Sequence, residues 1–396
     1  MVSYLLVSII DMKTPFQFGK VVEGRSFTNR TKEIQRLEAN FENNIHTILI
    51  SPRRWGKSSL VHRAAKNSLK NHSDIRVCFL DLFKIRNEED FYAEFAKQAI
   101  RATSNKVDEW VATAKLFLKR VTPRFSFGID PINDFEMNFD VKELLDSYEE
   151  ILNLPEQIAK SKKISIIICI DEFQNLANFK EPDLFQKRLR AVIQHHQSVT
   201  YCLFGSKRHM LTEIFENPSM PFYRFGDVLY LEKIAKTELV NFIVNGFNQT
   251  GKKISPELAE KVADSMRCHP YYVQQFSYIV WINTQTEVTE KIMEESIEEL
   301  LQQNDLFFLK EVDNLSTTQV NFLKAVAKGV QGLSSASVLQ QYQLGTSANV
   351  NKIKESLEKK EIIDTYGAQV EFLDPAFEKW FIKHFNNSNG ISAIHR

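Results

Sequence analysis

The chain has 396 residues, of which 43% are hydrophobic and 25% charged, a composition typical of globular proteins with two or three domains. Its 50 lysines and arginines balance 50 aspartates and glutamates, which excludes an overall basic field for nucleic acid or membrane but leaves room for a local patch. The four cysteines are far apart and form no C-x-x-C pair, which argues against zinc or disulfides and favours the cytoplasm.

Residues 1–14 precede the first predicted domain as an amino-terminal extension. The apolar run at their start is too short to span a bilayer and lacks the flanks of a signal peptide. We consider a start codon placed too early, with Met12 as the true first residue, a short additional strand, or, least favoured, a lipid anchor. A chain that starts at Met12 is expected to fold normally.

The first predicted helix begins near residue 30, where Thr28 or Asn29 can cap it. Its apolar positions are spaced for one face, which is typical of a packing helix. The alternative, supported equally, is that Phe27, Asn29 and Arg30 form a lid over the base of a nucleotide bound at the loop that follows.

Residues 46–60, HTILISPRRWGKSSL, predict a buried strand, a tight loop and a helix start. The loop nearly matches the Walker A pattern G-x-x-x-x-G-K-[ST], with Ser51 in place of the first glycine. In such loops, backbone N–H groups at a helix N-terminus bind nucleotide phosphates. Gly56 allows close approach of the backbone, Lys57 reaches the β- and γ-phosphates, and Ser58 places its hydroxyl on Mg²⁺. The expected nucleotide contacts are Ser51, Pro52, Arg53, Arg54, Trp55, Gly56, Lys57, Ser58 and Ser59.

Helices and strands alternate after this loop. We expect helices over residues 59–70, 89–119 and 141–161 and a strand over residues 76–82. Residues 121–140 contain two segments with period-two alternation, joined by Pro131, Asn133 and Asp134, which predicts a hairpin insertion. A partner contact at this hairpin is conceivable, but a decorative insertion is the simpler interpretation.

Residues 163–172 form an apolar run that ends in Asp171 and Glu172. This pattern is typical of a parallel strand buried on both faces, and open α/β sheets bind ligands at the carboxyl ends of their strands. Asp171 suits the Walker B role on Mg²⁺, and Glu172 that of the base that activates water. Alone, the run could be a core strand with a polar loop; together with the Walker A loop it indicates nucleotide binding.

A helix over residues 185–195 and strands over residues 198–206 and 227–231 complete a pattern typical of a parallel sheet with helices on both faces. Ser206 either donates a hydrogen bond toward the γ-phosphate or the attacking water, or caps the next helix. Arg224 either stabilises phosphate charge, within one subunit or across a subunit boundary, or forms a surface ion pair.

From residue 233 the alternation stops. Helices are expected over residues 237–248, 255–267, 270–281, 289–304 and 305–312, and they form an all-helical domain over residues 233–312. Residues 313–386 predict three helices (317–328, 335–341 and 347–359) and then a hairpin, the layout of a winged helix, and residues 387–396 form a tail. The expected recognition helix, residues 347–359, has no arginine and balances lysines with glutamates, which favours packing against protein over DNA binding.

These residues resemble the archaeal-type ATPases, a prokaryotic branch of the AAA+ superfamily close to the STAND ATPases. Residues 51–60, SPRRWGKSSL, are similar to the family's GPRRxGKTSL loop, and residues 170–174, IDEFQ, to its Walker B segment. Gly205-Ser206 resembles its sensor-1 region, residues 27–33 its N-terminal box, and residues 268–271, CHPY, the segment that opens a lid helix. The similarity covers most of the chain.

The resemblance implies an α/β P-loop domain of the AAA+ type over residues 15–232, with the sensor-1 strand between the Walker B and P-loop strands. A helical lid and a winged helix follow it. The implied roles are phosphate and Mg²⁺ binding by Lys57 and Ser58, Mg²⁺ binding by Asp171, base for Glu172, sensor for Ser206, arginine finger for Arg224, and β-phosphate contact for His269 beside Pro270. The chain departs from the family at Ser51 and at Cys268, where relatives often have glycine.

The function that we predict is a slow, Mg²⁺-dependent ATPase that binds ATP and ADP and acts as a conformational switch for a protein partner. It would be a cytoplasmic monomer or nucleotide-dependent oligomer without membrane contact. The alternative is a DNA-associated loader or transposition-type ATPase that uses the winged helix, which a basic face would favour. A third hypothesis, a scaffold with little turnover, would need no catalytic base such as Glu172.

Overall fold

The computed structural model describes residues 14–22, 27–104, 106–130, 132, 134–366 and 369–385. The chain divides into two compact units: residues 30–232, here called the sheet unit, and residues 1–29 with 233–396, the helical unit. The predictions for residues 1–11, for the turn residues Pro131 and Asn133 and for the tail 387–396 lie outside the described residues.

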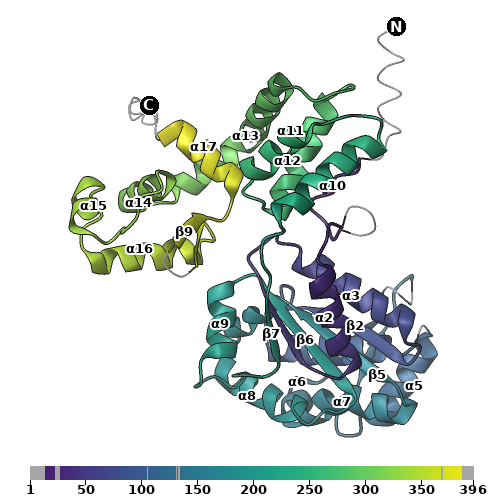
Figure 1. Cartoon of the computed structure of the whole chain (residues 1–396). Helices are drawn as coiled ribbons and strands as arrows, with labels where there is room; N and C mark the ends of the chain where they lie inside the picture. The colour runs from purple at the N-terminus through teal and green to yellow at the C-terminus, as the bar shows by residue number, and fades with distance from the viewer. Residues whose placement is uncertain are drawn as a thin grey trace. The chain divides into compact units, whose positions relative to one another are not determined.

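The sheet unit contains a five-stranded parallel sheet with the strand order β2-β5-β6-β1-β7 (Figure 1). The strands are β1 (Thr47–Ile50), β2 (Ile75–Asp81), β5 (Ser165–Asp171), β6 (Val199–Gly205) and β7 (Asp227–Tyr230). β6 therefore lies between the Walker B strand β5 and the P-loop strand β1, which confirms the order that the resemblance implied.

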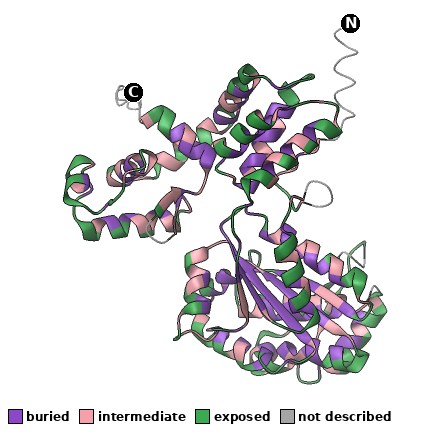
Figure 2. Ribbon diagram, viewed as in Figure 1, coloured by how far each residue is buried: buried purple, intermediate pink, exposed green. Residues whose placement is uncertain are grey.

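Helices cover both faces of this sheet. α2 (Thr31–Glu42) and α3 (Lys57–Asn71) pack together on one face, and α4 (Glu88–Arg101), α7 (Tyr148–Lys162) and α8 (Pro182–Ile193) form the layer on the other. β6 is buried along its whole length, and Figure 2 shows the strands of the sheet buried between the helices. Both faces are covered, so the strands have long apolar runs rather than an alternating pattern.

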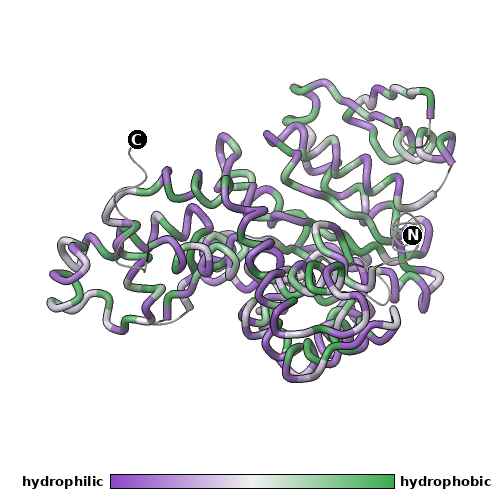
Figure 3. Tube along the Cα trace, turned by 90° about the horizontal axis from the view of Figure 1, so that it is seen from above, coloured by the Kyte–Doolittle hydropathy of each residue, from purple (hydrophilic) through white to green (hydrophobic). Residues whose placement is uncertain are grey.

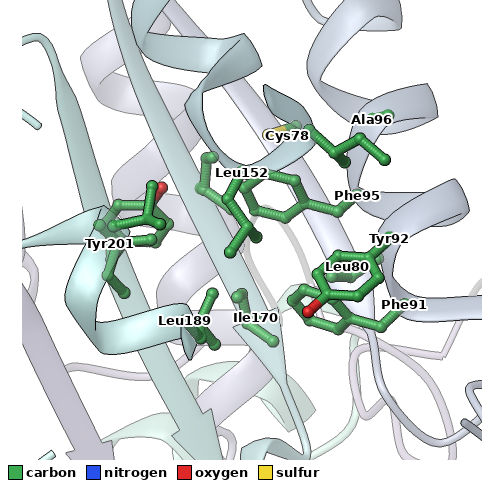
Figure 4. Close-up of a cluster of buried hydrophobic side chains, with 14 of the residues drawn as sticks. Cys78, Leu80, Phe91, Tyr92, Phe95, Ala96, Leu152, Ile170, Leu189 and Tyr201 are labelled. Carbon is green, nitrogen blue, oxygen red and sulfur yellow. The ribbon is translucent and has the colours of Figure 1, made fainter. Parts of the chain in front are cut away.

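A large hydrophobic cluster fills the space between the sheet and its second helical layer (Figure 4). Leu80 and Ile170 come from neighbouring strands, and Phe91 and Phe95 come from α4. Leu152 of α7 completes this part of the core and is fully buried. Burial of each such side chain stabilises the fold by roughly 1.5–3 kcal/mol before entropy costs, so this cluster holds the Walker B strand in place.

Two predicted helices are each divided in the structure. Residues 89–119 form α4 and α5 (Val107–Phe117), because polar side chains at the break bind the backbone: the Thr103 hydroxyl donates to the Ile100 carbonyl at 2.8 Å. Residues 141–161 form α6 (Val141–Asp146) and α7, interrupted at Ser147 with φ −129°. Periodicity did not reveal either break, since both flanking helices pack on the same core.

Other elements also differ from expectation. The helices predicted over residues 289–304 and 305–312 are one helix, α13 (Glu290–Asp313). Asp305, where the second helix was expected to start, lies inside α13, and its carboxylate accepts a hydrogen bond from the Trp380 indole at 2.7 Å. A 3-10 helix, η2 (Phe173–Asn178), follows β5 unpredicted. The predicted hairpin is present as β3 (Arg124–Ser126) and β4 (Glu136–Asn138), and α9 (Arg208–Glu216) follows β6.

The helical unit contains α10 (Lys236–Gln249), α11 (Pro256–Ser265), α12 (Pro270–Asn283) and α13. The winged helix follows with α14 (Thr317–Ala327), α15 (Ala336–Gln341), α16 (Ser347–Lys359), the hairpin β8 (Ile363–Tyr366) and β9 (Gln369–Phe372), and α17 (Pro375–Phe385). Figure 3 shows hydrophobic and hydrophilic residues interspersed along the chain. Sequence reasoning missed α17, although Asp374 caps it by accepting from the N–H groups of Ala376 and Phe377. No helix among the described residues is long and apolar enough to cross a membrane.

An amino-terminal segment joins the core of the helical unit. Phe16 is 1% exposed, and its ring lies 5.7 Å from that of Phe242 and 5.5 Å from that of Phe247. Gly246 makes room for this ring, because a Cβ at that position would lie 2.8 Å from the Phe16 Cζ atom. The segment around Phe16 therefore packs in the same core as residues more than two hundred positions further along the chain.

Replacement of Phe16 by alanine is expected to lower the free energy of unfolding of the helical unit by ~3–5 kcal/mol, because it leaves a cavity beside α10. Thermal melting of the full chain measures this loss. A chain that starts at Met12 keeps Phe16 and is expected to melt like the full chain. Val21→Ala, at a position 42% exposed, is the control on the same segment. An unchanged melting temperature for Phe16→Ala would contradict this packing.

Candidate active site

The Walker A loop joins the end of β1 to the start of α3. Gly56 caps α3 with φ 87° and ψ 16°, and Arg54 also has a left-handed backbone with φ 64°. A Cβ at Gly56 would meet no atom within 4 Å, so the glycine serves the backbone conformation rather than space. The first N–H groups of a helix have no partner within it, so the start of α3 offers donors to an anion.

Ser51 occupies the position at which the family's loop has glycine. It is fully buried, and its hydroxyl donates to the Pro52 carbonyl at 3.1 Å. Ser51 is not among the residues with positive φ, so the loop enters in a conformation that a side chain tolerates. The departure from the Walker A pattern is therefore compatible with the loop geometry.

Ser58 and Asp171, 113 positions apart, meet directly. The Ser58 hydroxyl donates to Asp171 Oδ2 at 2.8 Å, at the carboxyl end of β5. Burial raises the pKa of Asp171, and the Lys57 ammonium and the Ser58 hydrogen bond oppose that shift. A hydroxyl and a carboxylate oxygen at this spacing are the hard oxygen ligands that Mg²⁺ prefers, so the residues fit a magnesium site.

Glu172 is the most heavily contacted carboxylate of the site. Its Oε1 lies 3.2 Å from Lys57 Nζ, and its Oε2 accepts from the Ser206 N–H at 3.3 Å and the Ser206 hydroxyl at 3.0 Å. Gln174 Nε2 also donates to Oε2. Burial alone would raise the pKa of Glu172, but Lys57 and these hydrogen bonds outweigh it and lower the pKa below its usual value. Glu172 is therefore ionised at neutral pH and can accept a proton.

The sequence left open whether Ser206 lies in the site or caps the next helix, and the structure shows where its hydroxyl points. α9 begins at Arg208, and its N-cap residue is Lys207, without a side-chain capping bond. The Ser206 hydroxyl points instead to the Glu172 carboxylate. Ser206 thus lies within the site, beside the proposed base; its contact with a nucleotide stays a prediction.

Arg30 and Asn29, the predicted lid over the base, have left-handed backbones with φ 74° and 52°. Arg30 is 5% exposed, and its guanidinium donates from Nη1 to the Glu232 carbonyl at 2.6 Å and to Glu33 Oε1 at 2.9 Å. These bonds tie the start of α2 to the chain that leaves β7. A role of Asn29 and Arg30 toward the base stays a prediction.

Arg224 lies away from the loop. It precedes β7, and β7 runs parallel to β1, so Arg224 is at the amino edge of the sheet whereas the Walker A loop is at the carboxyl edge. Its backbone N–H donates to the Phe215 carbonyl at 3.1 Å, and its exposed guanidinium stacks on Tyr223 at 5.2 Å. This placement separates Arg224 from the Walker A loop of its own chain.

His269 and Pro270 belong to the helical unit, where they begin α12. His269 is 5% exposed, and its ring lies edge-on to Tyr272 at 4.7 Å. Their contact with a nucleotide stays a prediction. Sequence reasoning did not assign Gln174; its place two residues after Glu172, inside the quoted Walker B segment, was the available signal.

Comparison with known proteins identifies the family of the chain and supports the fold. A family model described as an ATPase domain predominantly from Archaea matches residues 27–276, and one described as a probable winged helix domain matches residues 307–383. No curated protein matches the chain.

Solved structures share the fold at low identity. A Walker-type ATPase of Pyrococcus abyssi is 18% identical with a TM-score of 0.65, over 93% of this chain and 99% of its own. The ORC2 protein of Aeropyrum pernix, solved as ADPNP–ADP complexes, is 12% identical with a TM-score of 0.57, over 93% and 98% of the two chains. These likenesses concern the arrangement of helices and strands.

Proposed function

Because the chain belongs to the family of ATPase domains found predominantly in Archaea, we propose that it binds Mg²⁺-ATP at residues 51–59 and hydrolyses it slowly. The observation that carries this proposal is the convergence of two motifs at the carboxyl edge of the sheet. Ser58 contacts Asp171, and Lys57 contacts Glu172. Sites of open α/β sheets lie at this edge.

The proposed chemistry follows from the side chains that meet at this edge of the sheet. Lys57 and the N–H groups at the start of α3 bind the phosphates, while Ser58 and Asp171 hold Mg²⁺, which neutralises charge on the phosphate oxygens when bound. Glu172 accepts a proton from water, and Ser206 orients the groups around it.

Arg224, at the opposite edge of its own sheet, would serve only the site of a second copy of the chain, so we propose that turnover increases with self-association.

We propose that nucleotide binding acts as a switch through the helical unit. His269 contacts Tyr272, whose hydroxyl donates to Asp374 Oδ2 at 2.5 Å, at the start of α17. A second link joins Arg267 to the buried Glu378 of α17. A ligand that contacts His269 in one state only would bias the lid and the winged helix together, because a ligand shifts an equilibrium through differential contacts.

A DNA-associated role receives less support from the winged helix. The exposed residues of α16 include Lys352 and Lys359, with Glu355 between them. This surface lacks the basic excess that usually drives DNA binding. The protein partner remains the favoured target of the switch.

The deciding experiment is steady-state ATP hydrolysis by the full chain, with and without Mg²⁺ and double-stranded DNA, at two salt concentrations and several protein concentrations. We expect slow, Mg²⁺-dependent turnover that DNA does not change and that rises with protein concentration. DNA stimulation that fades with salt would support the loader alternative instead. No phosphate release under any condition would contradict the proposed hydrolysis.

A further inference from the structure

We propose that Gln174 is a positioning residue for the base Glu172. Together with Ser206 it holds one carboxylate oxygen, Oε2, so that the other oxygen, Oε1, accepts the proton from the attacking water. This inference rests on the proposed ATP hydrolysis and adds to it a residue that the Walker motifs do not assign.

The two oxygens of Glu172 have different partners. Oε2 receives three hydrogen bonds, from Gln174 Nε2, the Ser206 N–H and the Ser206 hydroxyl. Oε1 faces Lys57 Nζ at 3.2 Å. The donors on Oε2 belong to η2 and to Ser206, the residue directly after the buried strand β6, whereas Lys57 has a flexible side chain that can turn toward phosphate.

The orientation of the Gln174 amide follows from its surroundings. The side chain is 1% exposed, and only the NH₂ group can face a carboxylate oxygen, since the amide carbonyl would repel it. Gln174 Oε1 is buried and accepts no hydrogen bond from any described residue. A buried carbonyl without a donor destabilises a fold. The amide therefore costs stability at this position, which points to a role in the contact with Glu172.

Gly205, the last residue of β6, leaves the space that this amide needs. A Cβ at Gly205 would lie 2.0 Å from Gln174 Oε1. Its φ is outside the left-handed range, so the glycine is required here for room rather than for backbone conformation. Glu172 itself has φ 52°, and the backbone N–H of Asn175 donates to its carbonyl at 2.9 Å. This turn brings Gln174 back to the carboxylate that precedes it.

In the proposed reaction, these contacts leave Oε1 as the oxygen that accepts the proton. When Lys57 turns to the phosphates, Oε1 loses its partner while Oε2 keeps its donors. The O–H bond of the attacking water breaks, its proton moves to Oε1, and its oxygen forms the bond to the γ-phosphorus. The bond from that phosphorus to the ADP oxygen breaks, and ADP keeps the electron pair. Without the amide, the carboxylate rotates and Oε1 leaves the line of attack.

The test is Gln174→Met in the full chain, which keeps the side-chain volume and removes the donor. We expect kcat for Mg²⁺-ATP to fall about 10- to 100-fold, as for a misplaced base, with KM and the calorimetric Kd for ATP unchanged. In a Glu172→Gln background, Gln174→Met should cause no further loss, because its effect passes through Glu172. Gln186→Met is the matched control, since Gln186 is 2% exposed on α8 and makes no hydrogen bond to Glu172 among the described contacts.

Gly205→Ala is a second way to move the Gln174 amide, because the new Cβ on β6 would occupy the space of Gln174 Oε1. It should reproduce the kcat loss, and it carries the test if Gln174→Met does not fold. Normal kcat in either folded variant, or an equal loss in Gln186→Met, would overturn the inference while leaving ATP hydrolysis intact. Absence of turnover in the unaltered chain would overturn the proposed function and this inference together.

Discussion

Replacement of Lys57 by alanine is expected to abolish measurable ATP binding, with a Kd at least about 100-fold weaker, or ~3 kcal/mol of lost binding free energy. Lys57 is 7% exposed at the first turn of α3, so its ammonium meets phosphate in a site largely shielded from water. The substitution also leaves Glu172 without the cation that lies 3.2 Å from Oε1. An uncompensated carboxylate would then repel the phosphates.

Isothermal calorimetry with Mg²⁺-ATP measures this loss, and the change in intrinsic tryptophan fluorescence, to which Trp55 in the loop contributes, offers an independent readout. Lys70→Ala is the matched control, because Lys70 is an exposed lysine in the last turn of the same helix. Unchanged affinity in Lys57→Ala, with Lys70→Ala also unchanged, would remove the Walker A assignment.

Glu172→Gln is expected to keep ATP binding and to lower kcat by at least about 100-fold, the range for loss of a general base. The amide keeps the size of the side chain and can still contact Ser206, so the site retains its shape. It cannot accept a proton at neutral pH. The carboxylate can, because Lys57 and its hydrogen bonds keep the pKa of Glu172 low enough for the ionised form.

The measurement combines phosphate release with calorimetric binding on the same preparation. Glu181→Gln is the control, because Glu181 is an exposed carboxylate just before α8. Normal turnover in Glu172→Gln would show that another group activates water. Loss of both ATP binding and turnover would mean that Glu172 is needed to position Lys57 for binding.

Several features were predictable from local sequence because their physical causes are local. The apolar run that ends in Asp171 is typical of a strand buried on both faces, and β5 (Ser165–Asp171) has that burial. The turn at Gly56 requires a left-handed backbone, which is why glycine stands there. That the two motifs meet was also predictable, since parallel strands bring their carboxyl ends to one edge; the direct contacts Ser58–Asp171 and Lys57–Glu172 were found only in the structure.

Interruptions of helices were less predictable, because periodicity does not record where a helix breaks. Inside segments that read as continuous helices, the Thr103 hydroxyl donates to the Ile100 carbonyl and the backbone of Ser147 leaves the helical range. Conversely, two predicted helices form the single helix α13, in which Asp305 accepts a hydrogen bond from Trp380, 75 residues away.

By itself, then, the sequence indicated the Walker A loop, the two carboxylates at the end of β5 and the succession of sheet, helical and winged-helix segments, because composition and short-range spacing encode them. Only the tertiary structure decided that Ser206 points to Glu172 rather than capping α9, that Arg224 lies at the edge of the sheet opposite its own loop, and that Gln174 holds Oε2. The direction of each strand and the packing of its neighbours set these positions. No local pattern carries that information, since each arises from segments that meet only after folding.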